Sequence, residues 1–390
     1  MPFDPEAPLP GAPDPWAASS MPAPRNGPPY AMTEMIAAEP ALAERLARRL
    51  TDDGKVARLA ADLRRAAEGG EPIVTTGCGT SEHAAMVVAE LLGDALRTTG
   101  VAHDRVWSAQ AFELAGRPPA SGVVLGISHE GGTPATNDAL RLAREAGAAT
   151  ALITVSARSP GAAIADTVIA TGEQDQSWCH TIGYLSPIVA GAALATAIHG
   201  ASLDPITVRA LLDAADDAPG AERIAAAFGR CSRLVVVGAG LDYPAGRELA
   251  LKVEEGVHLP ATAHQLETVR HGHLASADAA TGLVAILTDA DGRGPAVIER
   301  TAAVLRAAGA LGMPAAAIVA ADLGDDVPAD LTPAGRLAVP MAERIPRPIA
   351  GSLGSARPLQ LLAERLARAR GVNPDPIRRD DPRQAAAADA

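Results

Sequence analysis

The chain of 390 residues is long enough for two domains of ordinary size. Its formal net charge of −12 excludes a protein whose main partner is nucleic acid or an anionic membrane, because both attract a positive surface. Hydrophobic residues make up 48% of the chain and aromatic residues only 2%, so the core must be built from aliphatic side chains.

The cysteines and the apolar segments indicate a protein of the cytoplasm. Cys78, Cys179 and Cys231 are scattered and odd in number, which fits a reducing compartment better than a disulfide framework. No apolar run reaches the roughly 18 residues of a membrane helix. Residues 1–30 also lack the basic and apolar regions of a signal peptide.

Both ends of the chain are of low complexity. Residues 1–30 are rich in Pro, Ala, Gly and Asp without periodicity, which predicts a disordered segment, and Met32 could equally be the first residue. The tail, residues 379–390, is similar in character. Order is expected to begin with a helix over Glu34–Leu50.

Between the ends, strands alternate with helices in two successive runs. The first run has predicted strands at 73–76, 123–127, 151–155 and 167–170, and helices at about 81–96, 134–146 and 181–199. The second has predicted strands at 234–237, 283–287, 315–319 and 337–339, and helices from 243, around 297–308 and at 358–369. This alternation is typical of parallel, doubly wound sheets.

The two runs also resemble each other. Residues 75–85 align with residues 236–246, since each segment reads as a strand, a Gly-x-Gly turn and a helix. We infer two homologous α/β domains, residues 31–205 and 206–378, with a seam between about His199 and Asp216. Each is predicted to be a doubly wound parallel sheet in a flavodoxin-like three-layer sandwich.

The first motif is the glycine turn at Gly77–Ser81. Glycines let the chain turn sharply out of the strand, and Thr80 and Ser81 begin a helix whose free N–H groups could hold an anion. A dinucleotide fingerprint needs a third glycine three residues after Gly79. Glu82 stands there, so nicotinamide binding is not expected. The alternative is an ordinary helix N-cap without a ligand.

A second loop of this kind, Ser128–Thr133, follows the next predicted strand and again opens a helix. The carboxyl ends of neighbouring parallel strands form the usual ligand crevice, so we expect the two loops to lie side by side. The segment is a weak match to a hydrolase nucleophile elbow, because Glu130 stands where that motif has glycine. The alternative is a plain capped turn.

The third motif is a helix face in the second half. A helix from near Tyr243 would place Glu248, Lys252 and Glu255 on one face, at steps of four and three. Two carboxylates and an amine on an otherwise apolar helix suit proton transfer. The alternative is a surface pair of Glu248 and Lys252 with Glu255 solvated.

Four histidines follow this helix: His258, His264, His271 and His273. Their spacings match no zinc pattern, so no metal site is predicted. A single functional histidine, His271, is the preferred interpretation, and proton transfer by these groups needs no organic cofactor.

Taken in order, these stretches resemble the sugar isomerase (SIS) domain family, and more closely the isomerase half of the glucosamine-fructose-6-phosphate aminotransferases, over most of residues 32–380. The matching pieces are the opening helix at 34–40, Cys78-Gly-Thr-Ser81, Ser128-x-x-Gly131-x-Thr133, Glu248-Leu-Ala-Leu-Lys252-x-x-Glu255, Arg270-His271-Gly272, and the closing stretches 358–362 and 371–375.

The resemblance implies roles for the matching residues. The first domain would contact the phosphate of a hexose 6-phosphate through Cys78, Gly79, Thr80, Ser81, Ser128, His129 and Thr133. Glu255 falls on the proton-shuttling base of ketose–aldose isomerisation, supported by Glu248 and Lys252. His271 falls on the ring-opening histidine, which family members supply from a neighbouring subunit. A homodimer with a shared active site is therefore expected.

Three departures from the family bear on the substrate. Glu130 stands where a serine is usual, and a carboxylate facing a phosphate lowers its affinity unless a cation or proton intervenes. Glu130 could instead bind a hydroxyl or amine of an unphosphorylated sugar. The tail at 378–384 lacks the family's lysine, and residues 179–182 replace its Ala-Ser-Thr-Lys segment. No glutaminase half is recognisable, so glutamine-driven amination by this chain is not expected.

The predicted function is a phosphosugar or amino-sugar-phosphate isomerase or deaminase. Glu255 would move a proton between C1 and C2 through an enediol or enediolamine, a task that suits a carboxylate of raised pKa. Lys252 and helix N-termini would stabilise the charge, and ammonia or an amine would enter or leave at C1 or C2. The alternative is a regulatory module that binds a sugar phosphate without turnover.

Overall fold

The computed structural model describes residues 3–23, 25–101 and 104–388, and the chain divides into two compact units. Unit 1 comprises Met1–Ser20, Ala38–Asp175 and Ile182–Arg209. Unit 2 comprises Met21–Ala37, Gln176–Thr181 and Ala210–Ala390. The last boundary lies inside the seam predicted between residues 199 and 216. The units nevertheless differ from two continuous domains, because two short segments of the first half belong to unit 2.

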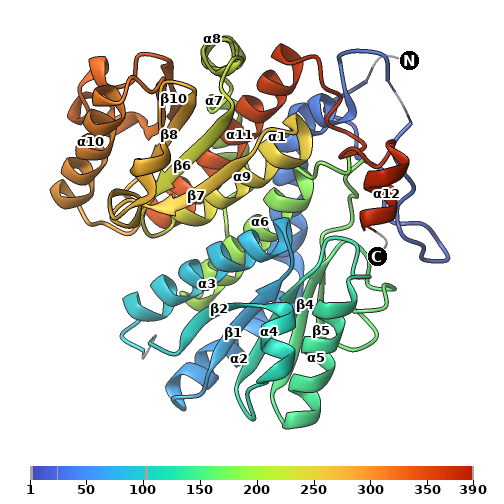
Figure 1. Ribbon diagram of the computed structural model, residues 1–390. Coiled ribbons are helices and arrows are strands. Elements are labelled where there is room, and N and C mark those ends of the chain that lie inside the picture. Colours follow the sequence, from blue (N-terminus) through green and yellow to red (C-terminus); the bar gives the residue numbers. More distant parts are fainter. Residues whose placement is uncertain (1–2, 24, 102–103, 389–390) are drawn as a thin grey trace. The chain divides into compact units, whose positions relative to one another are not determined.

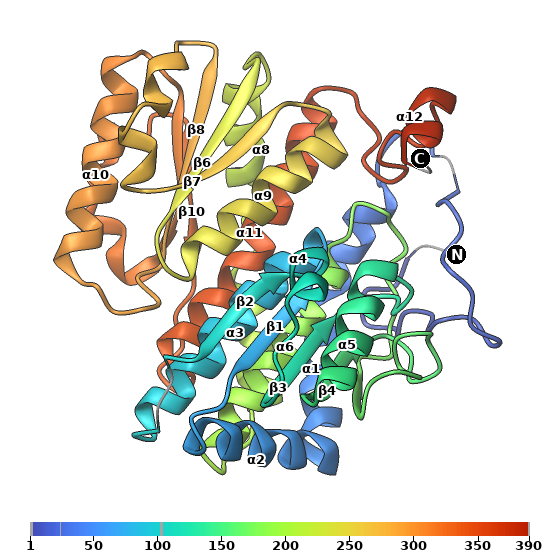
Figure 2. The ribbon, with the colours of Figure 1, turned by 60° about the horizontal axis from the view of Figure 1, so that its bottom comes forward.

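Unit 1 is built around a five-stranded parallel sheet (Figure 1). Its strands are β1 (Ile73–Gly77), β2 (Val106–Gln110), β3 (Val123–Ile127), β4 (Ala149–Thr154) and β5 (Thr167–Ala170), in the order β2-β1-β3-β4-β5. Its helices are α1 (Ala31–Asp52, which begins in unit 2), α2 (Gly54–Glu68), α3 (Thr80–Thr98), α4 (Ala111–Gly116), α5 (Pro134–Ala146) and α6 (Ile182–Ile198). Helices α4 and α5 share a core cluster with Val74 and Val124 on one face of the sheet. Helices α3 and α6 pack together on the other face (Figure 2).

Unit 2 has a second five-stranded parallel sheet. Its strands are β6 (Arg233–Gly238), β7 (Ala261–Gln265), β8 (Thr281–Leu287), β9 (Ala315–Ala320) and β10 (Gly335–Val339), in the order β10-β9-β8-β6-β7. The helices of this half are α7 (Pro205–Ala214, which spans the unit boundary), α8 (Ala218–Phe228), α9 (Asp242–Val257), α10 (Pro295–Ala310), α11 (Arg347–Ala369) and α12 (Pro382–Ala388). Short 3₁₀ helices cover Thr268–Arg270, His273–Ser276, Ala321–Asp326 and Ala329–Leu331.

Both sheets have the same topology. Taken from β7, the second sheet reads β7-β6-β8-β9-β10, which is the 2-1-3-4-5 order of the first and of flavodoxin-like folds. Strands β1 and β3 are buried at every residue, as expected when helices cover both faces of a parallel sheet. The predicted architecture of two doubly wound parallel sheets is therefore confirmed.

Helix α6 is the most apolar element of unit 1, and almost all of its residues are buried. Across the described ranges, no helix is both long and apolar enough to cross a membrane.

The sequence pattern did not predict the edge strands β2 and β7. Their sequences, Val-Trp-Ser-Ala-Gln and Ala-Thr-Ala-His-Gln, are partly exposed and contain no apolar run. An edge strand takes its hydrogen bonds from one neighbour only and buries less side-chain surface, so it leaves a weak periodic signal.

The N-terminal segment that was predicted to be disordered lies against unit 1. Glu6 forms an ion pair with Arg209 at 2.8 Å. Leu9 is buried, and its N–H donates to Glu173 Oε2 at 2.8 Å. Composition could not indicate these contacts, because it reports on the capacity to form a core and not on anchoring by distant side chains. Residues 1, 2 and 24, which the prediction also covered, lie outside the described residues.

The C-terminal region stabilises the start of α1. Both oxygens of Asp375 accept backbone N–H groups there, those of Ala31 and Met32, at 2.8 Å each. The carboxylate thus caps the helix from more than 300 residues away in sequence. Beyond it, the low-complexity tail forms α12, and residues 389–390 lie outside the described ranges.

Candidate functional site

The first predicted loop turns out of β1 at a position that only glycine can occupy. A Cβ on Gly77 would lie 2.7 Å from the carbonyl atoms of Ser81, so the tight return into α3 depends on its absence. Gly79 follows with φ at 58° and stands at the N-cap, where it offers no capping side chain. The start of α3, with Thr80 and Ser81, therefore has no side-chain cap of its own.

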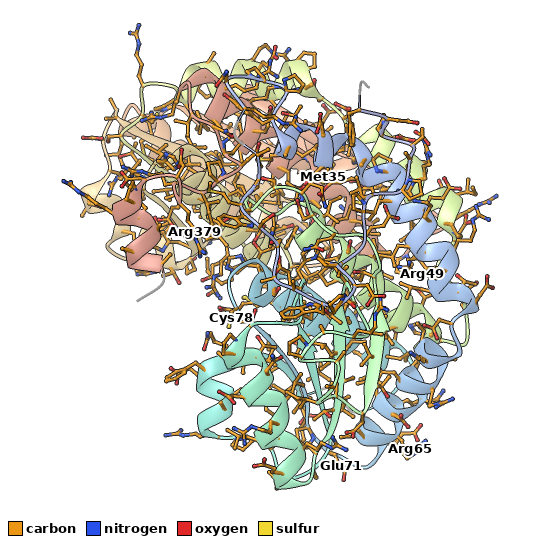
Figure 3. All side chains as sticks on the ribbon, turned by 90° about the vertical axis from the view of Figure 1, so that its right-hand side faces the viewer. Met35, Arg49, Arg65, Glu71, Cys78 and Arg379 are labelled. Atoms are coloured by element: carbon orange, nitrogen blue, oxygen red, sulfur yellow. The ribbon has the colours of Figure 1, made fainter. Side chains whose placement is uncertain are left out.

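Cys78 directly follows β1 (Figure 3) and contacts the first turn of α5 and the end of β2. Its Sγ is 3.8 Å from Thr136 Oγ1, in the first turn of α5, and accepts from Gln110 Nε2 at 3.7 Å. Burial raises the pKa of the Cys78 thiol. The residue is thus suited to donating a weak hydrogen bond and poorly suited to nucleophilic attack.

The second predicted loop follows β3, the direct neighbour of β1, so the structure brings the two loops together as expected. Ser128 Oγ accepts the Gly131 N–H at 3.2 Å and lies 3.3 Å from Thr133 Oγ1. Thr133 is the N-cap of α5 and makes no side-chain capping bond. Two hydroxyls and an uncapped helix start therefore meet at this edge of the sheet, a setting that suits an anion.

His129 supports the loop from inside. Its side chain is buried, and Nε2 accepts the backbone N–H of Asp175 at 3.0 Å. Its carbonyl oxygen accepts the hydroxyl of Thr154 at 3.1 Å. Because Nε2 provides the lone pair, this imidazole is neutral and holds the loop in place.

Glu130, the residue that departs from the family pattern, faces the N-terminal segment. Its carboxylate accepts the Ser19 N–H at 3.3 Å and the side-chain amide of Gln174 at 3.4 Å. Its carbonyl oxygen accepts the Trp16 indole N–H at 3.0 Å. The Trp16 ring lies so close to Gly132 that a Cβ there would approach it to 2.9 Å. The N-terminal segment is thus part of this loop's surroundings.

The predicted helix face on α9 is buried. Glu248 and Lys252 have no exposed side-chain surface, so the alternative of a solvated surface pair is wrong. Lys252 Nζ lies 2.6 Å from Glu255 Oε2 and 3.6 Å from Glu248 Oε1. Glu255 alone retains exposed surface, 26% of its side chain. One buried ammonium therefore lies between two carboxylates, of which one reaches solvent.

Burial by itself would lower the pKa of Lys252. The carboxylates of Glu255 and Glu248 outweigh this effect and raise the pKa of Lys252 above its ordinary value. The ammonium thus stays charged at neutral pH and provides a permanent positive charge beside Glu255.

His180 entered the sequence interpretation only as part of a departure from the family. Burial, reinforced by the charge of Lys252, lowers the pKa of His180 to about 4. A neutral imidazole thus belongs to the surroundings of this cluster. Nothing in its local sequence could have revealed this, because the charge of Lys252 acts on His180 from a position distant in sequence.

His271 lies apart from the buried cluster, in an exposed loop. Its side chain is 73% exposed, and Nε2 lies 2.9 Å from Glu267 Oε1. Glu267 also pairs with Arg300 at 2.9 Å, while His264 stacks on His273 with ring centroids 3.9 Å apart. Among the residues that the structure describes, no group of three or more His, Cys, Asp or Glu could hold a metal ion.

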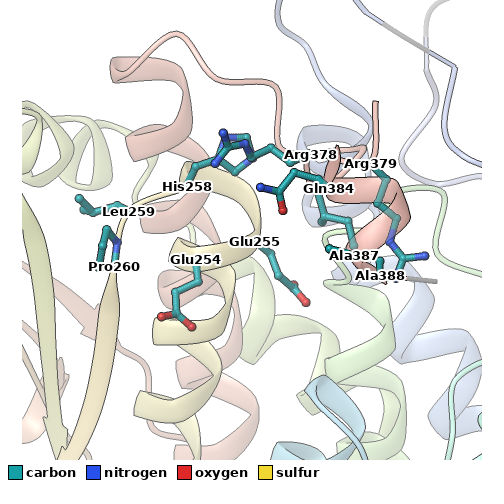
Figure 4. Close-up of a pocket in the computed structure, with 11 residues that line it drawn as sticks. Glu254, Glu255, His258, Leu259, Pro260, Arg378, Arg379, Gln384, Ala387 and Ala388 are labelled. Atoms are coloured by element: carbon teal, nitrogen blue, oxygen red, sulfur yellow. The ribbon is translucent and has the colours of Figure 1, made fainter. Parts of the chain in front are cut away.

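A pocket of about 580 Å³ lies at the end of α9, within unit 2 (Figure 4). Helix α9 contributes Glu254 and Glu255, and the tail contributes Arg378, Arg379 and Gln384. The other lining residues are His258, Leu259, Pro260, Ile377, Ala387 and Ala388. The sequence pattern indicated a missing lysine in this tail but gave no sign that its arginines line a pocket.

The corresponding loops of unit 2 are occupied by the chain's own carboxylates. Asp242, in the first turn of α9, is buried and accepts the N–H of Thr288 at 2.9 Å. Asp289 accepts the N–H groups of Arg293 and Gly294, at 2.6 and 3.0 Å, where α10 begins. These backbone N–H groups of unit 2 thus already have carboxylate acceptors, although α9 and α10 begin without a side-chain cap, as α3 and α5 do.

The family model for the SIS domain matches residues 71–197. Glutamine–fructose-6-phosphate aminotransferase of Halobacterium salinarum is 28% identical over 291 residues, which cover 70% of this chain and 47% of that protein. The chain spans about half the length of the curated relatives it matches.

The fold is also found in solved structures, of which two are described. The C-terminal domain of glucosamine-fructose-6-phosphate aminotransferase from Francisella tularensis superposes with a TM-score of 0.74 at 20% identity, covering 90% of this chain and 99% of that one. Tagatose-6-phosphate ketose/aldose isomerase from Escherichia coli gives 0.70 at 17% identity, covering 92% and 98%. The chain therefore carries a SIS domain at residues 71–197 and is homologous to the isomerase domain of glucosamine-fructose-6-phosphate aminotransferase.

Proposed function

We propose that this chain is an enzyme that moves a proton between C1 and C2 of a phosphorylated sugar or amino sugar, and so acts as an isomerase or deaminase. The observation that carries the proposal is the arrangement on α9, where buried Lys252 holds Glu255 at the edge of a pocket. A buried ion pair is weak evidence for stability, because desolvation offsets much of its attraction. It does orient a carboxylate, which is what a proton-transfer step needs.

In this proposal Glu255 takes a proton from one of the two carbons and returns it to the other. The electron pair of the broken C–H bond enters the enediol double bond and leaves it again, so no oxidant or reductant is needed. The Lys252 ammonium, 2.6 Å from Glu255, offsets negative charge during the step. Glu248 keeps that ammonium in place.

Phosphate binding is proposed for the two loops of unit 1. The contacts would come from Cys78, Gly79, Thr80, Ser81, Ser128 and Thr133. The uncapped starts of α3 and α5 support this assignment, as does the hydroxyl pair of Ser128 and Thr133. His129 would act through the loop that it holds, and Glu130 would limit how much negative charge the loop accepts.

His271 is proposed as the ring-opening group, acting on the substrate of a second copy in a homodimer. Its 73% exposure and its place outside the buried cluster on α9 support a role toward a neighbouring subunit. Glu267, 2.9 Å away, would hold the imidazole in one orientation.

The test measures proton–deuterium exchange at C1 and C2 of fructose 6-phosphate and glucosamine 6-phosphate. The reaction is run in heavy water and monitored by NMR. Exchange should be present in the wild-type chain and absent in Glu255→Gln, with binding of the sugar phosphate retained. Glu299→Gln, which removes an exposed carboxylate from α10, is the matched control and should exchange normally. Exchange that persists in Glu255→Gln would refute the assignment.

A regulatory module without turnover is the second candidate. Glu130 favours it, because its carboxylate and the attached N-terminal segment stand where an isomerase would have a phosphate-binding serine. Saturable binding of fructose 6-phosphate without exchange in the wild-type chain would establish this candidate. Binding of unphosphorylated glucosamine in preference to glucosamine 6-phosphate would instead show that Glu130 has changed the ligand.

A further inference from the structure

The pocket at the end of α9 is lined by two arginines, Arg378 and Arg379. Among the described residues, no carboxylate lies within ion-pairing distance of either one. Glu255, which lines the same pocket, already pairs with Lys252 at 2.6 Å. Two permanent positive charges therefore line the pocket beside the proposed base, together with the carboxylate of Glu254.

The backbone around this pocket is strained. Four non-glycine residues of the described chain have positive φ, and three of them line this pocket: His258 at 57°, Ile377 at 46° and Arg378 at 63°. This conformation is unfavourable for any residue with a Cβ, and especially so for the β-branched Ile377. Strain of this kind persists only where the surrounding structure enforces it, and it gathers at functional sites.

Contacts inside unit 2 hold the tail in this conformation. The Arg379 guanidinium lies over the Trp178 ring, 5.3 Å from its centroid. The N–H of Trp178 in turn donates to Asp375 O at 3.1 Å, just before the strained residues. Arg379 N–H donates to Pro376 O at 2.9 Å. The arginines are thus presented by a defined turn.

The chemistry of a guanidinium limits what this turn can do. Arginine keeps its proton at every accessible pH, so it cannot attack a carbonyl carbon to form an imine, as a lysine amine could. It can donate two parallel hydrogen bonds to a carboxylate. The pair of arginines therefore suits recognition of an anion and cannot form an imine.

We propose that Arg378 and Arg379 form a carboxylate-binding subsite beside Glu255, and that the substrate is an amino-sugar phosphate whose nitrogen carries an acidic substituent. The inference rests on the proposed function, because it places the reacting C1–C2 end of the sugar at Glu255. The amine is attached at that end, so a carboxylate on its substituent would lie next to the tail. The phosphate, at the opposite end of the sugar, would not.

The test compares two ligands that differ in one group. N-(1-deoxyfructos-1-yl)glycine 6-phosphate carries a carboxylate, and the glycinamide analogue carries a neutral amide of the same size. Dissociation constants are measured by calorimetry in Glu255→Gln protein, in which turnover is blocked. The glycine compound should bind about 10-fold more tightly, the lower end of what a charge-assisted hydrogen bond contributes, because both arginines are exposed.

Arginine substitutions show where that preference originates. In Glu255→Gln/Arg378→Gln/Arg379→Gln protein the two ligands should bind equally. Arg383→Gln, which removes an arginine of α12 that does not line the pocket, should leave the preference intact. The Arg378→Lys/Arg379→Lys pair in the same background keeps the charge and should retain part of the preference. Circular dichroism of each variant establishes that the fold is unchanged.

Three results would overturn the subsite. The first is that Glu255→Gln protein binds the glycine and glycinamide compounds equally well. The second is that the preference for the glycine compound survives the removal of both arginines. The third is that removing both arginines weakens the binding of both compounds and of fructose 6-phosphate by the same factor. The last would mean that the arginines bind the phosphate.

Deuterium exchange in the wild-type chain separates this inference from the proposed function. Exchange without a carboxylate preference refutes only the subsite, and a preference without exchange refutes only the catalytic role.

Discussion

Replacing Lys252 by methionine provides the sharpest test of the buried cluster on α9. Methionine has nearly the volume of lysine, so the change removes the charge without opening a large cavity. Glu248 has no exposed surface, and its carboxylate would lose the ammonium 3.6 Å away. Breaking a buried pair in this way destabilises a protein by about 3–5 kcal/mol. Glu255 contributes less to the loss, because water reaches 26% of its side chain.

The assay is urea unfolding of the full chain, in which the unfolding transition of unit 2 is monitored. Lys252→Met should lower its unfolding free energy by the amount above, and Glu248→Gln/Lys252→Met should recover most of it, because the double variant removes both charges of this buried pair. The raised pKa of Lys252 adds a second expectation. Its stabilising contribution is present below the unfolded pKa of about 10.4 and is lost only as pH rises through the higher folded value. The difference between Lys252→Met and wild type should thus stay constant between about pH 6 and 9. A loss below about 1 kcal/mol, or a double variant no more stable than the single one, would refute the reasoning.

Three further predictions concern other parts of the chain. Burial raises the pKa of Asp242 to about 6, from 3.8 when exposed. Between these values the folded state keeps a proton that the unfolded state releases. The free energy of unfolding should therefore fall by about 3 kcal/mol as pH rises from about 4 to 7. Asp242→Asn should lack this fall in denaturation curves at several pH values, and a wild-type-like slope would contradict the assignment. Gly77→Ala would place a Cβ 2.7 Å from the Ser81 carbonyl and should lower the free energy of unfolding by about 1–3 kcal/mol. It should also weaken the binding of fructose 6-phosphate, measured by calorimetry. Unchanged affinity would show that this loop does not bind the phosphate. Trp16→Ala removes the hydrogen bond to Glu130 O and should speed protease cleavage within residues 3–20. Mass spectrometry would detect the cleavage products. An unchanged rate would show that other contacts hold the segment.

The shared topology of the two sheets does not make the two units equivalent. Both have a glycine turn after the first strand and a helix behind it, and in both units the helices that follow the first and third strands in chain order begin without a side-chain cap. In unit 2 the carboxylates of Asp242 and Asp289 take the N–H groups that an anion would need. Two units with the same sheet topology therefore differ in their ionisable groups, and the buried cluster of Glu248, Lys252 and Glu255 lies in unit 2.

The local features of this protein could be predicted from its sequence because they depend on spacing along one element. Strand–turn–helix alternation predicted the parallel sheets, and the steps of four and three placed Glu248, Lys252 and Glu255 on one face of α9. The glycine turn at Gly77 could also be recognised, since a turn of this kind needs a residue without a Cβ.

Only the tertiary structure could decide which of these features are buried and what they contact. It showed that Lys252 is inaccessible to solvent, that His129 supports a loop, and that Glu130 contacts a segment 111 residues away. It also placed the tail arginines beside Glu255. Each of these results depends on groups that are distant in sequence and brought together by packing. Periodicity within one element carries no information about such contacts.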